Sequence, residues 1–448
     1  MSDTLPPPNA NKPLGNQAKE LEDSGHFSQA LDLYHQLYAQ QSGNSFAASG
    51  YLRCLRKLNR AEEAVVFGRE LPASLLNNPY VHRAIAWAIY DHYFKKSEDD
   101  NEDLVEPEGM QRASIIHQYE QMQKAAKYVL EKSPIDETLI RIKIVFGMCT
   151  EARQRERWQD MYYFATQLAP EHLSKEPKVH EGRQYMPDYQ RWLYKMLKPT
   201  FELQRYDECL QLAQQGCINY PSDKNFPWWQ ALAKRALGQT EEALSELQSL
   251  NKRFQEWYIQ RDIADVYTQL QQYQEAWIWY CKAALLPGKL HTRYKMFCAM
   301  ATLLQHLERW QDAYTHIQLA QMIAEHEGWS RPAEMLRTQL AQLATQYPIQ
   351  VQQDNVTNDF QTTARQLKQL WRREISAMRP RLRGTIKTMN ERSGFIYTEK
   401  GDYYFSMRDI PRHLPLAIGT TVEFELEESY DQKKQRESFK AVHVWILR

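Results

Sequence analysis

The stretch Trp257–His291 contains the pattern that most constrains this chain. Its first half places Ile263 and Tyr267 at helical spacing, and its second half does the same with Ala276 and Tyr280. The pattern predicts two amphipathic helices joined by a short polar turn. The small alanines suit places where two helix backbones approach closely, and the tyrosines fill the space beside them. One such pair cannot bury its own apolar face, so the chain must supply neighbours of the same kind.

The neighbours are found by sliding this pattern along the chain in steps of about 34 residues. The match is good near the N-terminus and strongest over 190–327, and it weakens between 79 and 189, where the spacing drifts. The matching positions are Phe297, Met300, Ala301, Leu304, Trp310, Ala313, Ile317 and Ala320 on one side, and Ala231, Gly238, Ala243, Leu247, Leu197, Tyr206, Cys209 and Ala213 on the other. A helix–turn–helix unit of this length resembles the tetratricopeptide repeat, which implies a superhelical α-solenoid over 17–347. Residues 1–16, rich in Pro and Asn, are expected to form a disordered tail.

The overall composition favours a cytoplasmic protein of neutral charge. The 56 basic and 56 acidic residues cancel, so bulk charge indicates no partner. No apolar run approaches the ~18 residues of a membrane helix, and the N-terminus does not read as a signal peptide. The six cysteines form no CxxC pair and lie on expected helices, which indicates buried, reduced thiols.

The sequence contains no motif of catalytic or cofactor chemistry. It has no P-loop, no GxGxxG after a strand, no HExxH, no GxSxG and no paired Cys/His zinc spacing. Its 13 histidines are scattered. We therefore expect a protein that is not an enzyme and that uses neither a cofactor nor a metal.

A basic segment separates the repeats from the end of the chain. Residues 348–361 break the helical pattern, and we expect a linker over 348–383 that contains a helix over 362–378. The basic residues on one face of this helix are Arg365, Lys368, Arg372 and Arg373. Two interpretations stay open: a solvated spacer, or a helix that lies beside whatever the last domain binds.

The last segment, 384–448, changes its apolar spacing to two, the period of β-strands. About five strands in such a short segment match a small closed barrel such as an OB-fold. The sequence GTIKTMNERSGFIYTEKGDYYFSMRDI, followed by LPLAIGTTVEFELEES and FKAVHV, resembles a cold-shock domain. The chain is thus predicted to be multidomain: an all-α tetratricopeptide-type superhelical solenoid followed by a small five-stranded all-β OB-fold barrel.

The resemblance implies a binding site on the barrel, because cold-shock domains stack bases of single-stranded RNA or DNA on outward aromatic side chains. Thr388 and Met389 stand where the family has Trp and Phe, and Met407 where it has another Phe, so several stacking faces are missing. Tyr397 and Tyr403 are candidates to replace them. The residues expected to contact nucleic acid are Lys387, Arg392, Phe395, Tyr397, Tyr404 and Arg408 on the barrel, with Arg372 and Arg373 on the preceding helix. Two alternatives stay open: these aromatic residues form the core of the barrel, or the barrel is degenerate and contacts protein or ribosome surfaces.

A second candidate site follows from the repeats. In tetratricopeptide stacks the first helix of each unit lines the concave groove, and the corresponding positions here lean basic and aromatic. They are Arg53, Arg56, Lys57, Arg191, Tyr194, Lys198, Trp228, Arg235, Tyr258 and Arg261. Such a surface would suit an acidic peptide or a folded RNA.

These observations together favour a non-enzymatic RNA-binding adaptor. Its solenoid would grip a protein or RNA partner, and its barrel would contact single-stranded RNA, in translation, RNA turnover or RNA-linked defence. Two alternatives stay open: a protein-interaction scaffold whose barrel has lost nucleic-acid binding, and a regulatory subunit of a larger complex.

Overall fold

The computed structural model describes residues 13–95, 112–133, 138–180, 182–349, 360–410, 416–431 and 436–446. The chain divides into two compact units, Met1–Trp229 and Gln230–Arg448. Most of the predicted tail lies outside the described residues. Helix α1 begins at Leu14, so the prediction of disorder up to residue 16 is wrong for its last residues.

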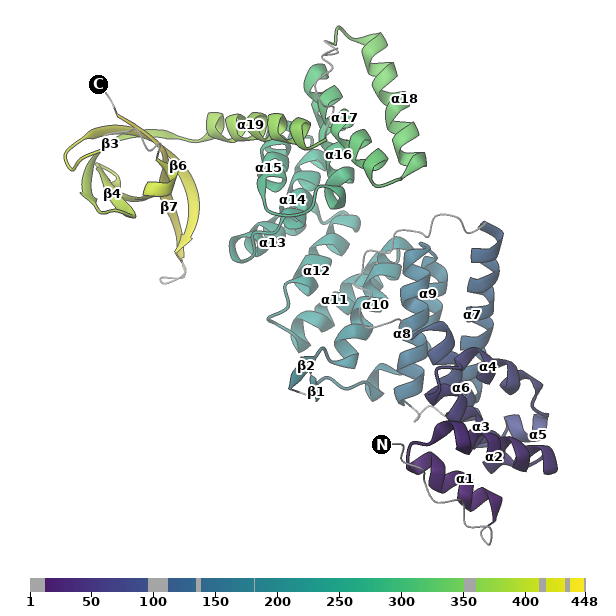
Figure 1. The fold of residues 1–448 in the computed structure, drawn as a ribbon. Helices are drawn as coiled ribbons and strands as arrows, with labels where there is room; N and C mark the ends of the chain where they lie inside the picture. The colour runs from purple at the N-terminus through teal and green to yellow at the C-terminus, as the bar shows by residue number, and fades with distance from the viewer. Residues whose placement is uncertain are drawn as a thin grey trace, which may run out of the picture. The chain divides into compact units, whose positions relative to one another are not determined.

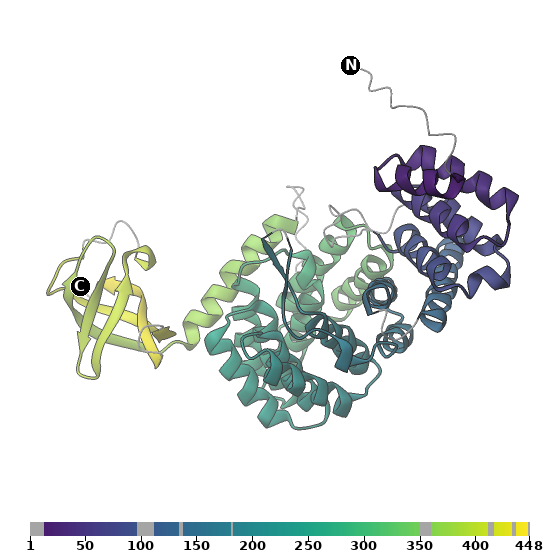
Figure 2. The ribbon, with the colours of Figure 1, turned by 90° about the horizontal axis from the view of Figure 1, so that it is seen from below.

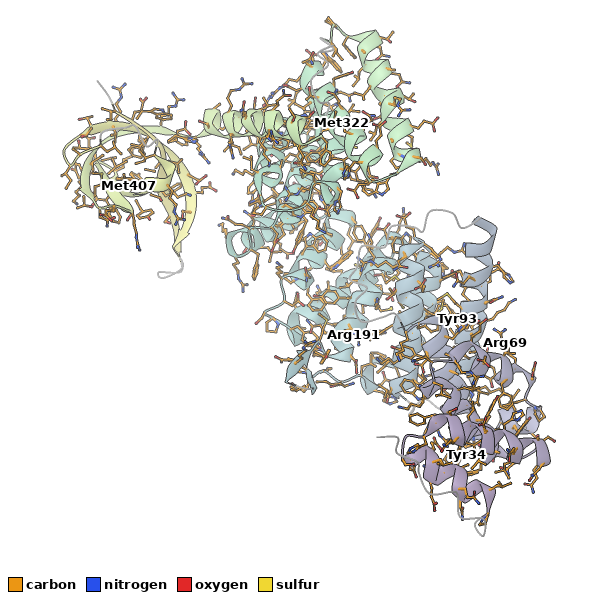
Figure 3. The ribbon with its side chains drawn as sticks, viewed as in Figure 1. Tyr34, Arg69, Tyr93, Arg191, Met322 and Met407 are labelled. Carbon is orange, nitrogen blue, oxygen red and sulfur yellow. The ribbon has the colours of Figure 1, made fainter. Side chains whose placement is uncertain are left out.

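The first unit consists of consecutive helices and one short hairpin (Figure 1). Its elements are α1 (Leu14–Asp23), α2 (Phe27–Gln40), α3 (Ser45–Lys57), α4 (Ala61–Glu70), α5 (Ala73–Leu76), α6 (Pro79–Tyr93), α7 (Arg112–Lys132), α8 (Thr138–Gln154), α9 (Trp158–Ala165), β1 (Lys178–His180), β2 (Arg183–Tyr185), α10 (Asp188–Glu202) and α11 (Tyr206–Asn219), and α12 (Asn225–Ala236) crosses into the second unit. Asn44 starts α3 because its side chain accepts a hydrogen bond from the Ala47 N–H at 3.0 Å. The pair α2–α3 is close-packed at Gly50, where an added Cβ would lie 2.4 Å from the ring of Tyr34, labelled in Figure 3.

The turns inside the helix pairs repeat one backbone feature. In each, a residue adopts a left-handed conformation, which ends the first helix and directs the chain into the second. The residues with φ between 52° and 83° in these turns are Gly25, Asn59, Glu156, Gln204, Gly238, Gln271, Glu308 and Gly328. Gly25 and Asn59 lie 34 positions apart, as do Gln204 and Gly238. The backbone therefore shows the period that the side-chain pattern predicts.

The second unit begins with the most regular repeats. Its helices after α12 are α13 (Thr240–Arg253), α14 (Trp257–Gln269), α15 (Tyr273–Leu285), α16 (Tyr294–His306), α17 (Trp310–His326), α18 (Ser330–Gln346) and α19 (Phe360–Met378). Ala276 is fully buried and Tyr280 nearly so, in one apolar cluster that runs from α14 to α19. This burial agrees with the expectation that Ala276 packs between helices.

Helix α19 belongs to this cluster, and its interpretation as part of a linker is wrong. Its apolar face, spaced Leu367, Trp371 and Ile375, is buried against α15, α16 and α17, and Figure 2 shows the helix running beside these elements before it enters the barrel. The Trp371 ring is fully buried and stacks on Phe297 with a centroid distance of 5.9 Å. Near its start, the Thr363 hydroxyl donates to the sulfur of Met322, labelled in Figure 3, at 3.7 Å.

Two polar side chains of α19 also fix its place. The indole N–H of Trp371 donates to Nε2 of His316 at 3.0 Å, while Nδ1 of that buried ring lies 2.7 Å from the Asp312 carbonyl oxygen. Glu374 accepts hydrogen bonds from the indole of Trp277 at 3.0 Å and from the Arg309 guanidinium at 2.9 Å. Because each of these hydrogen bonds joins a donor to an acceptor, they hold the second half of α19 in one position on the repeats.

The chain passes from α19 directly into a closed barrel of five strands, drawn in yellow-green and yellow in Figure 1. The strands are β3 (Arg381–Met389), β4 (Ser393–Thr398), β5 (Gly401–Ser406), β6 (Thr421–Asp431) and β7 (Arg436–Ile446), in the order β3-β4-β5-β7-β6. Its core contains Ile386, Ile396, Phe405 and Phe424. Gly394 is required on β4, because an added Cβ would lie 2.5 Å from the Phe405 ring.

One outer face of the barrel is taken up by the end of α19. The side chain of Glu425 on β6 is fully buried; it accepts a hydrogen bond from the Ser376 hydroxyl at 2.5 Å and lies 2.8 Å from Nδ1 of His443. Arg379 pairs with the next outward carboxylate, Glu427. This charged contact fixes the β6 side of the barrel to the helix and leaves β4 and β5 on other sides.

The structure thus confirms the predicted fold class, a tetratricopeptide-like solenoid of nineteen helices in the described residues followed by a closed five-stranded barrel. Within the described part of the chain, no helix has the length and apolar character needed to cross a membrane.

Candidate nucleic-acid interface

A row of side chains crosses the outer face of the barrel. Thr388 on β3 is in register with Phe395 on β4, Phe395 with Tyr404 on β5, and Tyr404 with Lys440 on β7. Phe395 and Tyr404 are 44% and 43% exposed, and their ring centroids lie 5.8 Å apart. Phe405, the next residue along β5, is fully buried in the core, because alternate residues of a strand face opposite sides. The alternative that Phe395 and Tyr404 form the core is therefore wrong for both.

The neighbouring register pair adds a third aromatic ring. Tyr397 on β4 faces outward opposite Asp402 on β5, and it is 53% exposed. Lys387 lies 5.9 Å from the centroid of its ring and pairs with Asp402 at 2.6 Å. We call the exposed rings of Phe395, Tyr397 and Tyr404 the aromatic row.

Two other positions singled out from the sequence face inward instead. Tyr403 packs on Phe424 at a centroid distance of 5.7 Å, so it does not replace a missing stacking residue. Met407, labelled in Figure 3, also packs against the barrel core. Thr388, by contrast, is exposed beside Phe395, so the place of the family's tryptophan lies at the edge of the aromatic row without a ring.

Exposed cations lie at one end of the row. Arg392, in the turn between β3 and β4, accepts a hydrogen bond at its carbonyl from the N–H of Met407 at 2.9 Å, and this bond brings Arg408 to the same end. Both arginine side chains are exposed. Among the described residues neither forms an ion pair, so both are available to an anion.

The basic face of α19 is exposed because the opposite face is buried. Arg365, Lys368 and Arg372 follow each other at helical spacing on the solvent side, with Arg373 beside them. Within the described part of the chain, the first three form no ion pair. Docking of the helix holds these cations at fixed positions, which a flexible linker would not do.

The predicted groove cations of the first unit, in contrast, mostly form ion pairs. Arg53 donates two hydrogen bonds to Glu22 at 2.6 and 2.9 Å. Burial acts to raise the pKa of Glu22, but the hydrogen bonds from Arg53 and Tyr34 outweigh it and hold that pKa below its usual value. Arg56 pairs with Asp91 at 2.7 Å and Lys57 is exposed.

The same pairing continues on α10 and α12. Arg191 contacts Asp188 at 3.5 Å and Lys198 contacts Glu202 at 2.5 Å. The Tyr194 hydroxyl donates to Asp223, and its ring stacks on Phe226 at 5.0 Å. The ring of Trp228 lies 5.1 Å from that of Trp229.

In the second unit Arg235 contacts Asp265 at 3.5 Å, and Arg261 contacts Asp262 at 2.5 Å. Tyr258 is half-buried, with its ring 6.1 Å from that of Trp257. Six of the predicted groove cations therefore have acidic partners, and the basic surface inferred from the sequence is largely neutralised. Three of the acids (Asp188, Glu202 and Asp262) lie on the same helix as their cation. The other three (Glu22, Asp91 and Asp265) come from other helices, so a count along one helix could not find them.

Two other kinds of site to consider are metal-binding clusters and reactive thiols. No group of three or more His, Cys, Asp or Glu among them is placed to hold a metal ion. All six cysteines are free, and burial raises the pKa of the Cys54 thiol to about 12, which makes it unreactive.

Comparisons with known proteins support the repeat architecture. The family model described as tetratricopeptide repeat matches residues 21–88. No curated protein matches the chain. The likeness of the barrel to a cold-shock domain stays a prediction.

Among solved structures, a tetratricopeptide repeat protein from Parabacteroides merdae shares 12% identity and a TM-score of 0.38, covering 74% of this chain and 97% of its own. A thermophilic TPR protein of Thermus thermophilus shares 13% identity and a TM-score of 0.20, covering 65% of this chain and 97% of its own. Yeast Tom70 shares 11% identity and a TM-score of 0.29, covering 81% of this chain and 88% of its own. The matched repeat family is typical of protein-interaction scaffolds.

Proposed function

We propose that this protein is a non-enzymatic cytoplasmic adaptor whose solenoid holds a protein partner and whose barrel binds single-stranded RNA. The observation that carries the RNA half is the aromatic row. Phe395 and Tyr404 are exposed side by side in register, and Tyr397 lies on the next pair. Exposed rings at this spacing suit successive bases, because every base has a face that can stack.

The charges around the aromatic row support the same proposal. Arg392 and Arg408 lie at one end without an acidic partner among the described residues, and Lys387 lies beside Tyr397. Phosphate groups of a strand whose bases stack on the row would meet these cations. The contact of Lys387 with Asp402 is exposed, so it opposes phosphate binding only weakly.

The protein half of the proposal is carried by the repeats. The first helices of the units carry aromatic and charged side chains that are fixed by ion pairs, as for Arg53 and Glu22. A surface of paired charges favours a partner that offers both signs, so we favour a folded or extended protein over an RNA in this groove.

The experiment compares the full chain with Phe395→Ala and Tyr404→Ala in titrations against a fluorescent 12-nucleotide oligouridine. Each change should weaken binding about tenfold or more, since one stacked base contributes ~1–3 kcal/mol. Thermal melts should stay the same, because both rings are exposed. Tyr80→Ala, at an aromatic residue of α6 that is 70% exposed, is the matched control and should bind as the unchanged protein does.

Folded Phe395 and Tyr404 variants that keep full RNA affinity would refute the RNA half of this function. The scaffold alternative would then stand, with a barrel that contacts protein.

A further inference from the structure

An exposed tryptophan lies on the barrel surface outside the aromatic row. Trp445 on β7 is 39% exposed, although tryptophan is usually highly buried. The guanidinium of Arg381 lies 5.5 Å from the centroid of its ring, and the His443 ring lies 6.0 Å away. The indole is thus held in place by a cation and still presents surface to solvent.

Strand register connects this tryptophan to the aromatic row. Trp445 is in register with Glu423 on β6, and Glu423 with Arg383 on β3. Two residues further along β3, Thr385 is in register with Tyr397. From β7 to β4 there are three strand steps, or about 14 Å at the usual strand spacing. This is a distance that a short single strand can span.

The surface between the two places suits a polyanion. Arg381 and Arg383 point outward on β3 about 6.6 Å apart, as residues two positions apart on a strand do. Thr385 and Thr421, the next outward pair, are short and leave the surface open. Two carboxylates lie beside these arginines. Glu423 lies 3.5 Å from Arg383 in an exposed contact, and the buried Glu425 lies 3.8 Å from Arg381, whose side chain stays more than half exposed.

We propose that Trp445 and Arg381 form a second base-stacking platform. A bound RNA strand then runs from the aromatic row across β3 and β6 to β7. The inference rests on the proposed RNA binding and adds the path and length of the site. A strand too short to reach β7 uses the aromatic row alone. A longer strand gains a further stack on Trp445 and phosphate contacts with Arg381 and Arg383.

The test titrates the full chain with oligouridines of 4 and 12 nucleotides. Trp445→Ala should weaken binding of the longer strand about fivefold or more and leave the shorter one unchanged. Trp445→Phe should recover most of the loss. Arg381→Gln, which keeps the tryptophan, should weaken binding of the longer strand and reduce the salt dependence of that binding. The proposal can therefore still be judged if Trp445→Ala fails to fold. Ile418→Ala, at an exposed barrel residue outside both places, is the control.

The outcomes separate this inference from the function it rests on. If Phe395→Ala weakens binding but Trp445→Ala and Arg381→Gln bind the longer strand as the unchanged protein does, the second platform is refuted and RNA binding stands. A lower melting temperature with full affinity would assign Trp445 a purely structural role and also refute it. If the unchanged protein binds neither strand, both proposals fall.

Discussion

The first helices of the solenoid repeats and the outer face of the barrel both carry arginine side chains, which are paired with carboxylates on the solenoid and exposed on the barrel. Arg53 and Arg261 on the solenoid each contact a carboxylate within 2.6 Å. Arg372 on α19 and Arg408 on the barrel are exposed and have no such partner among the described residues. The difference teaches that composition alone does not say whether a cation is available. What matters is whether a carboxylate lies within reach, on another helix as for Glu22 or on the same helix as for Asp262. We therefore expect changes at the paired cations of the solenoid to reduce stability, and changes at the exposed cations of α19 or the barrel to reduce binding.

The largest effect should come from Trp371→Ala. It removes a fully buried indole, its stack on Phe297 and its hydrogen bond to His316, which together hold α19 to the repeats. We expect a loss of ~3–5 kcal/mol in the free energy of unfolding, measured by denaturant titration. Arg372→Ala, at the exposed neighbouring position, should change it little. Equal losses for both would show that α19 does not dock as described.

Acidification should weaken the same contact. Burial lowers the pKa of His316 from 6.5 to about 4, so the unfolded chain takes up a proton that the folded chain excludes. This contribution is absent above pH 6.5 and destabilises the fold increasingly as the pH falls towards 4, by at most ~1.4 kcal/mol per pH unit. Arg309, near the ring, opposes protonation in the folded state. The measurement is the pH dependence of unfolding in the unchanged protein and in His316→Gln, which should show a smaller slope over this range; identical slopes would contradict the assignment.

The basic face of α19 should affect binding and not folding. Replacing Arg365, Lys368, Arg372 and Arg373 by Gln should weaken RNA binding and reduce its salt dependence. The slope of log affinity against log salt should fall by at most about 3, given ~0.7 per phosphate contact on a single strand. Arg183→Gln, at an exposed cation of the β1–β2 hairpin, is the control. Unchanged affinity at low salt would leave this face as a solvated surface.

The smallest effect on stability is expected at Arg365 on α19, and it is to be compared with a change at Arg53 on the solenoid. Arg53→Gln leaves Glu22 partly buried without its bidentate partner, and we expect a loss of ~1–3 kcal/mol in stability. Arg365→Gln should change stability by less than ~0.5 kcal/mol, because no described group depends on it. Thermal melts of both variants are sufficient. Equal shifts would mean that the two surfaces do not differ as described.

The sequence predicted what depends on local periodicity. The spacing of Ala276 and Tyr280 indicated a helix crossing, and the alternation around Tyr404 and Phe405 indicated one outward and one inward ring. It could not predict the docking of α19, because Trp371 stands among basic residues and its partner His316 is 55 positions away. Long-range pairs of this kind leave no local pattern.

Less of the candidate site than of the fold could be predicted from the sequence. Phe395, Tyr397 and Tyr404 lie together as the cold-shock resemblance implied, although their binding role stays a prediction. Trp445 was missed, since the resemblance directs attention to the second and third strands. An isolated tryptophan at an outward strand position, with Arg381 on a neighbouring segment, was the available signal.

The left-handed turn residues also bear on how such repeats diverge. Gly25 and Gly238 adopt this conformation without a side chain, whereas Gln204, Gln271 and Glu308 adopt the same backbone conformation with one. A side chain there costs little next to the packing of two helices, so mutation can change these residues while the helices keep their relative phase. The relative orientation of successive helices thus depends on the backbone conformation of the turn and not on which residue occupies it. The tetratricopeptide repeat model matches residues 21–88, and the same left-handed turn recurs as far as Gly328.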